Sequence, residues 1–122
     1  LEELRRLGAR TDGVIESRQT MTIRKTRVVA HSQQVVRFDH EAPDLPAAAA
    51  ARLLAFVEKR AADFDAVVVS DYGKGVISPE LLARLAALRA RRSFRLIVDP
   101  KKPNFDHYRG ITLATPNVGE AA

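Results

Sequence analysis

Three short apolar segments in the second half of the chain limit most strongly what it can fold into. They cover residues 66–69, 96–98 and 111–114, and each of them leads into a run of polar residues. A continuous apolar segment of this length is typical of a strand that is covered on both faces, as in a parallel sheet. We therefore expect an α/β fold in which polar residues follow the carboxyl ends of parallel strands.

Two helical patterns accompany these segments. Residues 47–62 contain five consecutive alanines and an apolar stripe, which together favour a helix. A second helix is expected to begin after Ser78, its N-cap, and to end near residue 91, because Pro79 is well suited to a first turn. The order of strand, helix, strand, loop, strand and new helix is that of a parallel α/β sheet.

Residues 21–38 do not follow this order. β-branched residues are frequent in residues 21–30, and a second short run covers residues 34–38, so a hairpin or two adjacent strands are expected. In residues 21–38 polar and apolar side chains alternate in such a way that neither face of the expected hairpin is cleanly apolar. We expect such a flap to present polar groups to a ligand or to a partner subunit.

Composition narrows the classes of partner. A formal net charge of +5 favours anionic partners in general. The basic residues are dispersed, and five Phe and two Tyr offer no stacking platform, so we expect no nucleic-acid partner. Without cysteine there is no disulfide framework, and no apolar run approaches the about 20 residues of a membrane span. A cytoplasmic protein without a membrane partner is expected.

The first candidate site lies in residues 71–75, after the first apolar segment. Two glycines allow the backbone to approach a ligand, while Asp71 and Lys74 supply charges that could hold a sugar hydroxyl or a phosphate. A plain strand-to-helix turn with a solvated lysine is the alternative. The segment is not a P-loop, which needs a longer glycine-rich loop that ends in Gly-Lys-Ser/Thr.

Two further candidate sites follow the next segments. Asp99 and Lys101 flank a proline, and Lys101 could neutralise a phosphate; a surface ion pair is the alternative. Asn117 and Glu120 are three residues apart, which places both on one face of a helical turn. Their oxygens suit a hydrated magnesium ion and the phosphates that it bridges, although a helix-capping box would use the same spacing.

The hairpin segment contributes a fourth polar group. The side chains of this group can form forked or multiple hydrogen bonds to a phosphorylated or polyhydroxylated ligand. The alternative is that they are strand residues exposed to solvent. They are Arg27, Gln33, Gln34 and Arg37. The three histidines match no zinc spacing, and neither a Gly-x-Ser-x-Gly elbow nor a Ser-His-Asp arrangement can be argued.

Residues 26–39, 70–75, 98–101 and 115–120, in this order, closely resemble the heptose 7-phosphate kinases of the ribokinase-like (PfkB) carbohydrate kinases. The resemblance covers nearly the whole chain. Its Gln-Gln flap and Asp-Tyr-Gly-Lys-Gly turn are more specific to this branch than Asn-x-x-Glu, which the wider superfamily shares. It implies part of a ribokinase-like parallel-sheet sandwich, with residues 21–38 as a small antiparallel β flap that serves as a lid and as a dimer contact.

The same resemblance implies transfer of the ATP γ-phosphate to the anomeric hydroxyl of D-glycero-D-manno-heptose 7-phosphate, an early step toward the ADP-heptose of bacterial lipopolysaccharide. It implies ATP and magnesium as cofactors and a homodimer formed through the flap. The implied sugar-phosphate ligands are Arg27, Gln33, Gln34, Arg37, Asp71 and Lys74. The implied ATP ligands are Asp99, Lys101, Asn117 and Glu120, the last two also organising magnesium.

Two motifs of that family are missing from residues 1–122, namely an N-terminal Gly-Gly region and a C-terminal Gly-Ala-Gly-Asp that provides the catalytic aspartate and an anion hole. We therefore expect an interior part of a kinase domain that does not turn over alone and that exposes apolar surface. A fused adenylyltransferase domain is common in the family. A ribokinase-like kinase for another sugar and a basic module that binds nucleic acid remain open as alternatives.

Overall fold

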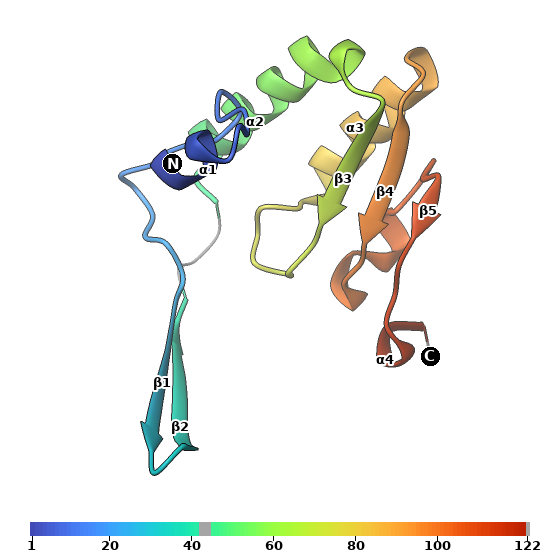
Figure 1. The fold of residues 1–122 in the computed structure, drawn as a ribbon. Helices are drawn as coiled ribbons and strands as arrows, with labels where there is room; N and C mark the ends of the chain where they lie inside the picture. Colours follow the sequence, from blue (N-terminus) through green and yellow to red (C-terminus); the bar gives the residue numbers. More distant parts are fainter. Residues whose placement is uncertain (42–44, 122) are drawn as a thin grey trace.

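The structure, a computed structural model, describes residues 1–41 and 45–121, and it consists of an α/β body from which a hairpin projects (Figure 1). The helices and strands are α1 (Glu2–Arg6), β1 (Arg24–Ala30), β2 (Gln33–His40), α2 (Ala47–Arg60), β3 (Ala66–Ser70), α3 (Pro79–Arg91), β4 (Arg95–Asp99), β5 (Leu113–Ala114) and α4 (Val118–Ala121). Two 3-10 helices, η1 (Ala61–Asp63) and η2 (Lys102–His107), complete the set. The α/β class is confirmed. Among the helices of the described ranges, none is both long and apolar enough to cross a membrane.

The body is built on a parallel sheet of three strands in the order β3-β4-β5. Val67 pairs with Leu96 and Val98 with Ala114, so all three strands point the same way (Figure 1). The last strand is shorter than residues 111–114 because Thr112 uses its side chain as well as its backbone. The Thr112 hydroxyl accepts the Leu96 N–H at 3.0 Å, and the Thr112 N–H donates to the Leu96 carbonyl at 2.7 Å.

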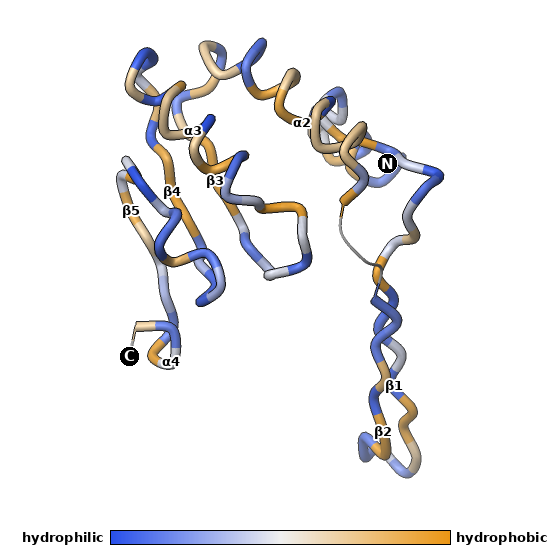
Figure 2. Tube along the Cα trace, turned by 180° about the vertical axis from the view of Figure 1, so that it is seen from behind, coloured by the Kyte–Doolittle hydropathy of each residue, from blue (hydrophilic) through white to orange (hydrophobic). Residues whose placement is uncertain are grey.

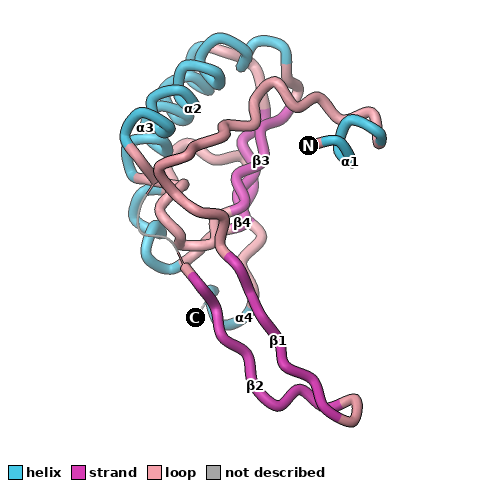
Figure 3. Tube along the Cα trace, turned by 90° about the vertical axis from the view of Figure 1, so that its left-hand side faces the viewer, coloured by secondary structure: helices cyan, strands magenta, loops and turns pink. Residues whose placement is uncertain are grey.

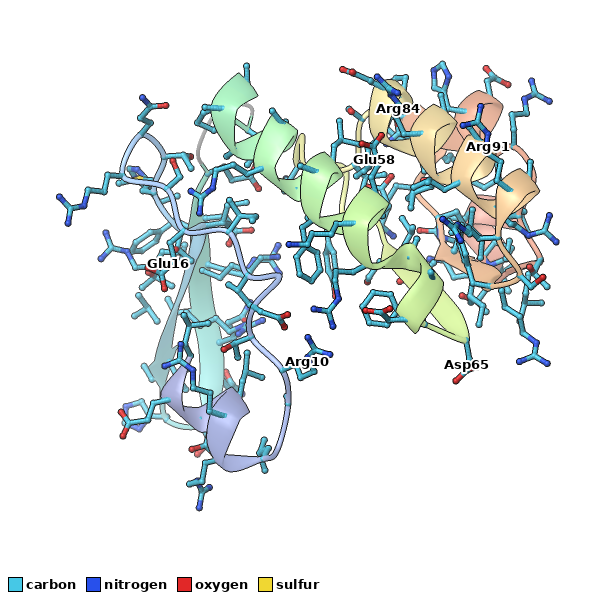
Figure 4. All side chains as sticks on the ribbon, turned by 90° about the horizontal axis from the view of Figure 1, so that it is seen from above. Arg10, Glu16, Glu58, Asp65, Arg84 and Arg91 are labelled. Carbon is cyan, nitrogen blue, oxygen red and sulfur yellow. The ribbon has the colours of Figure 1, made fainter. Side chains whose placement is uncertain are left out.

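Helices α2 and α3 cover one face of this sheet (Figure 3). The core between these layers consists of Ala61, Val69, Leu81, Leu82, Leu85, Phe94, Leu96 and Val98. The two helices also approach each other at their surface, where Arg84 Nη1 lies 3.6 Å from Glu58 Oε1 (Figure 4). On the opposite face Val68 is 66% exposed, so the expected apolar surface is confirmed. Helices on both faces, which residues 66–69 predict for the intact sheet, stay a prediction.

Helix α3 begins as its sequence predicts. The Ser78 side chain accepts the Leu81 N–H at 3.2 Å and Pro79 occupies the first turn. The 3-10 helix η2 lies where the sequence predicts only a loop between the second and third apolar segments.

Strands β1 and β2 form the expected antiparallel hairpin, connected by His31 and Ser32, whose φ angles are 48° and 64°. Two central residues with positive φ are characteristic of a type I′ turn, whose twist matches that of the strands. Figure 2 shows hydrophilic and hydrophobic stretches alternating along the hairpin.

The register of the hairpin agrees with the prediction that neither face is cleanly apolar over its whole length. Thr26 pairs with Phe38, and Val28 pairs with Val36, so one face is almost entirely apolar over this stretch. The other face carries two charged pairs, Arg27 with Arg37 and Lys25 with Asp39. Arg24 and His40 pair two positions beyond Thr26 and Phe38 on the more apolar face, so charged or polar side chains occur on both faces of the hairpin.

Candidate functional site

The polar residues that follow the three parallel strands lie on one edge of the sheet, as expected. Asp71 follows β3, Lys101 follows β4, and Asn117 follows β5 just before α4. The loops after β3 and β4 are joined directly, since the Asp71 N–H donates to the Asp99 carbonyl at 3.0 Å. In an open α/β sheet this carboxyl edge is where ligands bind.

Asp71 is buried, with 1% of its surface exposed. Its Oδ1 accepts the Gly73 N–H at 2.7 Å. Its Oδ2 accepts hydrogen bonds from Asn104 Nδ2 at 2.7 Å and from the Tyr108 hydroxyl at 2.6 Å. Both oxygens of this carboxylate therefore have protein partners, and the side chain shapes the loop after β3 from within. Its assignment as a sugar-phosphate ligand stays a prediction.

Lys101 and Glu120 form an ion pair between the loop after β4 and helix α4. The hydrogen bond from Lys101 lowers the pKa of the Glu120 carboxyl, with a further contribution from the Asn117 backbone N–H. The same pair raises the pKa of the Lys101 ammonium. A cation and a carboxylate are thus held together where a phosphate and a magnesium ion were expected.

Asn117 and Glu120 form the capping box that their spacing allowed. The Glu120 N–H donates to Asn117 Oδ1 and the Asn117 N–H donates to Glu120 Oε2, both at 3.0 Å. Within residues 1–41 and 45–121 no cluster of three or more His, Cys, Asp or Glu side chains is arranged to hold a metal ion. The role of these two residues in magnesium binding stays a prediction.

Lys74 connects the body to the base of the hairpin. Its Nζ lies 2.5 Å from Glu41 Oε1, just beyond the end of β2, and both side chains are partly exposed. Asp99, the last residue of β4, is half-buried and pairs with Ser70 in the sheet. The structure therefore places Lys74 and Asp99 near the carboxyl edge together with Asp71.

The hairpin residues are not gathered at this edge. Gln33 and Gln34 are exposed at the start of β2, beside the turn that lies farthest from the body (Figure 1). Arg27 and Arg37 are directly opposite each other across the two strands, and Arg37 Nε lies 3.3 Å from Asp39 Oδ1. The structure thus brings the two arginines together but separates the Gln pair from Asp71 and the other edge residues.

Sequence reasoning missed two residues of the site, Asn104 and Tyr108. They come from η2 and the position after it, more than 30 residues from Asp71 in the chain. Local patterns carry no signal for such a contact. A polar side chain inside a short connection between two buried strands is the sole hint that the sequence offers.

Together these features define the chain as an α/β protein that gathers the polar residues of three loops at the carboxyl edge of a parallel sheet. No family model matches it.

Curated relatives define it further. The chain is 43% identical over 115 residues to the bifunctional protein HldE of Geobacter metallireducens, a match that covers 93% of the chain and 24% of that protein. It is 40% identical over 115 residues to the bifunctional protein HldE of Citrifermentans bemidjiense, a match that covers 93% of the chain and 24% of that protein. It is 38% identical over 122 residues to the bifunctional protein HldE of Trichlorobacter lovleyi, a match that covers 99% of the chain and 25% of that protein. The chain spans about a quarter of the length of these relatives. Over nearly all of its length, it is homologous to one segment of the HldE proteins, which confirms the resemblance found in its motifs.

Proposed function

We propose that residues 1–122 form an interior part of the ATP-dependent kinase domain of a longer cytoplasmic protein. The complete domain would transfer the ATP γ-phosphate to the anomeric hydroxyl of D-glycero-D-manno-heptose 7-phosphate, on the route to ADP-heptose. The gathering of Asp71, Lys101 and Glu120 at one sheet edge carries the proposal, because phosphoryl transfer depends chiefly on positioned charges. Similarity to the HldE proteins supports it.

Asp99, Lys101, Asn117 and Glu120 form the proposed ATP side of the site. Lys101 brings a positive charge for a phosphate, and the oxygens of Asn117 and Glu120 keep lone pairs beyond those used in the capping box. These oxygen atoms fit a magnesium ion, which prefers oxygen ligands and binds through one or two carboxylates plus phosphates. When bound, the ion neutralises charge on the triphosphate.

Asp71, Lys74 and the hairpin form the proposed sugar-phosphate side. Like charges directly opposite each other destabilise a strand pair, and Asp39 compensates the Arg27–Arg37 pair on the same face. A phosphate bound by both guanidinium groups would compensate them more fully, because arginine forks match phosphate oxygens. Gln33 and Gln34 would contact the sugar from the tip of the flap once it closes over the site.

The apolar face of the hairpin supports the proposed homodimer. Val28, Val36 and Phe38 are 42%, 46% and 56% exposed on one face of a two-stranded ribbon. Two strands alone are marginally stable in water, and an exposed apolar patch of this kind is typical of an interaction surface. We infer that a second copy of the hairpin covers this face in the complete protein.

The test uses the longer protein and measures ADP release. Activity is expected with heptose 7-phosphate and not with ribose or fructose 6-phosphate. Glu120→Gln is expected to raise the KM for magnesium-ATP about tenfold, equivalent to about 1.4 kcal/mol of binding. Glu58→Gln, the same change on the outer surface of α2, is the matched control and should leave the KM unchanged (Figure 4).

Three results would contradict the proposal. If the activity of Glu120→Gln depends on magnesium as that of the native protein does, Glu120 does not have the proposed role in binding magnesium-ATP. Turnover of ribose or fructose 6-phosphate would favour a kinase for another sugar. Binding of random-sequence RNA that weakens steeply with salt, without any response to magnesium-ATP, would favour a basic binding module.

A further inference from the structure

Tyr108 bridges two loops at the carboxyl edge through one hydroxyl group. The hydroxyl lies 2.6 Å from Asp71 Oδ2, to which it donates, and it accepts the Lys101 backbone N–H at 2.9 Å. Asp71 begins the loop after β3 and Lys101 belongs to the loop after β4. This side chain therefore links the two loops, in addition to the backbone hydrogen bond from Asp71 to Asp99.

Asn104 strengthens the same junction from η2. Its side-chain amide donates to Asp71 Oδ2 at 2.7 Å and to the Ile77 carbonyl at 3.0 Å, and only 9% of the residue is exposed. The loop after β3 is thus held at both ends, at Asp71 and just before α3. Buried polar groups are costly to leave without partners, so removing one member of this network weakens the others.

The network continues from Lys101 into the proposed ATP side. The Lys101 backbone is held by Tyr108, and its side chain pairs with Glu120, which is in turn bound to Asn117 by the capping box. Burial and the hydrogen bond to Asp71 raise the pKa of Tyr108 to about 12. The phenol therefore remains protonated near neutral pH, and its single proton stays available to Asp71.

We propose that Tyr108, assisted by Asn104, is a positioning residue that holds the Lys101 backbone against Asp71 and so fixes Lys101 for an anionic ligand. The kinetic consequence rests on the proposed kinase function, whereas the bridging itself does not. Without the hydroxyl, the Lys101 N–H loses its acceptor and the loop after β4 gains freedom. The ordering of that loop would then have to occur on ligand binding, which weakens affinity.

The kinetic test compares Tyr108→Phe with His107→Gln in the longer protein. His107, the exposed last residue of η2 and the neighbour of Tyr108, serves as the control. Tyr108→Phe is expected to raise the KM for magnesium-ATP about tenfold while kcat stays within about twofold, the pattern of lost uniform binding. A merely structural role would reduce the amount of active protein and hence kcat, with KM unchanged, and that result would overturn the proposal.

Amide hydrogen exchange in the longer protein tests the bridging independently of any kinase activity. In Tyr108→Phe the Lys101 amide is expected to exchange about tenfold or more faster, because it has lost its acceptor. The Leu82 amide, bonded to the Ser78 carbonyl in α3, is the internal control and should keep its rate. An unchanged Lys101 rate overturns the proposal.

The two measurements separate the two hypotheses. If the longer protein does not phosphorylate heptose 7-phosphate but Lys101 exchange accelerates, the kinase function fails and the bridge stands. If Tyr108→Phe does not fold, Asn104→Ala is measured instead. It keeps the hydroxyl bridge but removes one donor to Asp71, so a smaller KM increase of about twofold to threefold is expected. An unchanged KM in that variant overturns the proposal.

Discussion

The hairpin and the body are both built from β-branched and apolar strands, but their surroundings are opposite. In the body, Leu96 and Val98 are 1% and 0% exposed under α3. In the hairpin, Val35 and Phe38 are 65% and 56% exposed. Similar local sequence therefore gives one element that is stabilised by a core and another that is stabilised mainly by its own hydrogen-bond ladder. The comparison shows that strand patterns predict secondary structure far better than they predict burial.

Their polar groups differ in the same way. At the carboxyl edge of the body, Asp71, Lys101 and Glu120 already bind protein partners, which fixes their positions. On the hairpin, Arg27 and Arg37 face each other on an exposed ribbon. A fixed set of charges suits a preorganised site, whereas an exposed ribbon suits a surface that closes on a ligand or on a partner.

The largest expected effect comes from the same substitution made in both regions. Val98→Ala is expected to lower the free energy of unfolding by about 2 kcal/mol, because it removes buried methyl groups and leaves a cavity. Val35→Ala should change it by less than about 0.5 kcal/mol, because that side chain is already exposed. Urea denaturation of the chain measures both. Equal losses would mean that the hairpin is as well packed as the body, which would break the comparison.

A smaller effect, of opposite sign, is expected in the hairpin turn. Ser32 has a φ of 64°, a conformation that is unfavourable for residues with a Cβ by about 1 kcal/mol or more, whereas Gly73 serves the loop after β3 with a φ of 63°. Ser32→Gly is therefore expected to stabilise the hairpin by up to about 1 kcal/mol. Amide exchange of β1 and β2 measures the change.

Ser93→Gly is the control for that substitution. Among the described residues, positive φ angles of non-glycine residues occur at His31 and Ser32, so Ser93 gains nothing from the freedom of glycine. Faster exchange in the hairpin of Ser32→Gly would contradict the turn geometry.

The sequence predicts much of the body because its signals there are local. The apolar strands, the Ser78 cap and the Asn117–Glu120 box each depend on residues within a few positions of one another. The junction of Asp71 with Tyr108 depends on residues 37 positions apart, and only the packed fold brings them together. The pairing register of the hairpin strands escaped prediction for a related reason. Their register depends on a turn at His31 and Ser32, which lacks the usual Asn-Gly signal.

The smallest effect is expected at the carboxyl edge and depends on pH. The pKa of Glu120 is lowered in the folded chain by Lys101, so the carboxylate stabilises the fold at pH values above its ordinary pKa of about 4.5. This contribution is lost as the pH falls through the lowered value, because the proton then breaks the pair. Glu120→Gln should therefore be less stable than the native chain at neutral pH, and the difference should shrink below pH 4.5. Unfolding free energies of both chains across this range measure it.

Glu58→Gln provides the contrast for the pH experiment, since the pair of Glu58 with Arg84 is exposed on the surface between α2 and α3. Exposed pairs contribute little, so this change should alter the free energy of unfolding by less than about 0.5 kcal/mol. A loss in Glu120→Gln that is the same at every pH would show that the carboxylate acts through packing and not through its charge. The edge would then resemble the hairpin, in which exposed charges contribute little to stability, and the fixed array of charges inferred for the body would no longer stand.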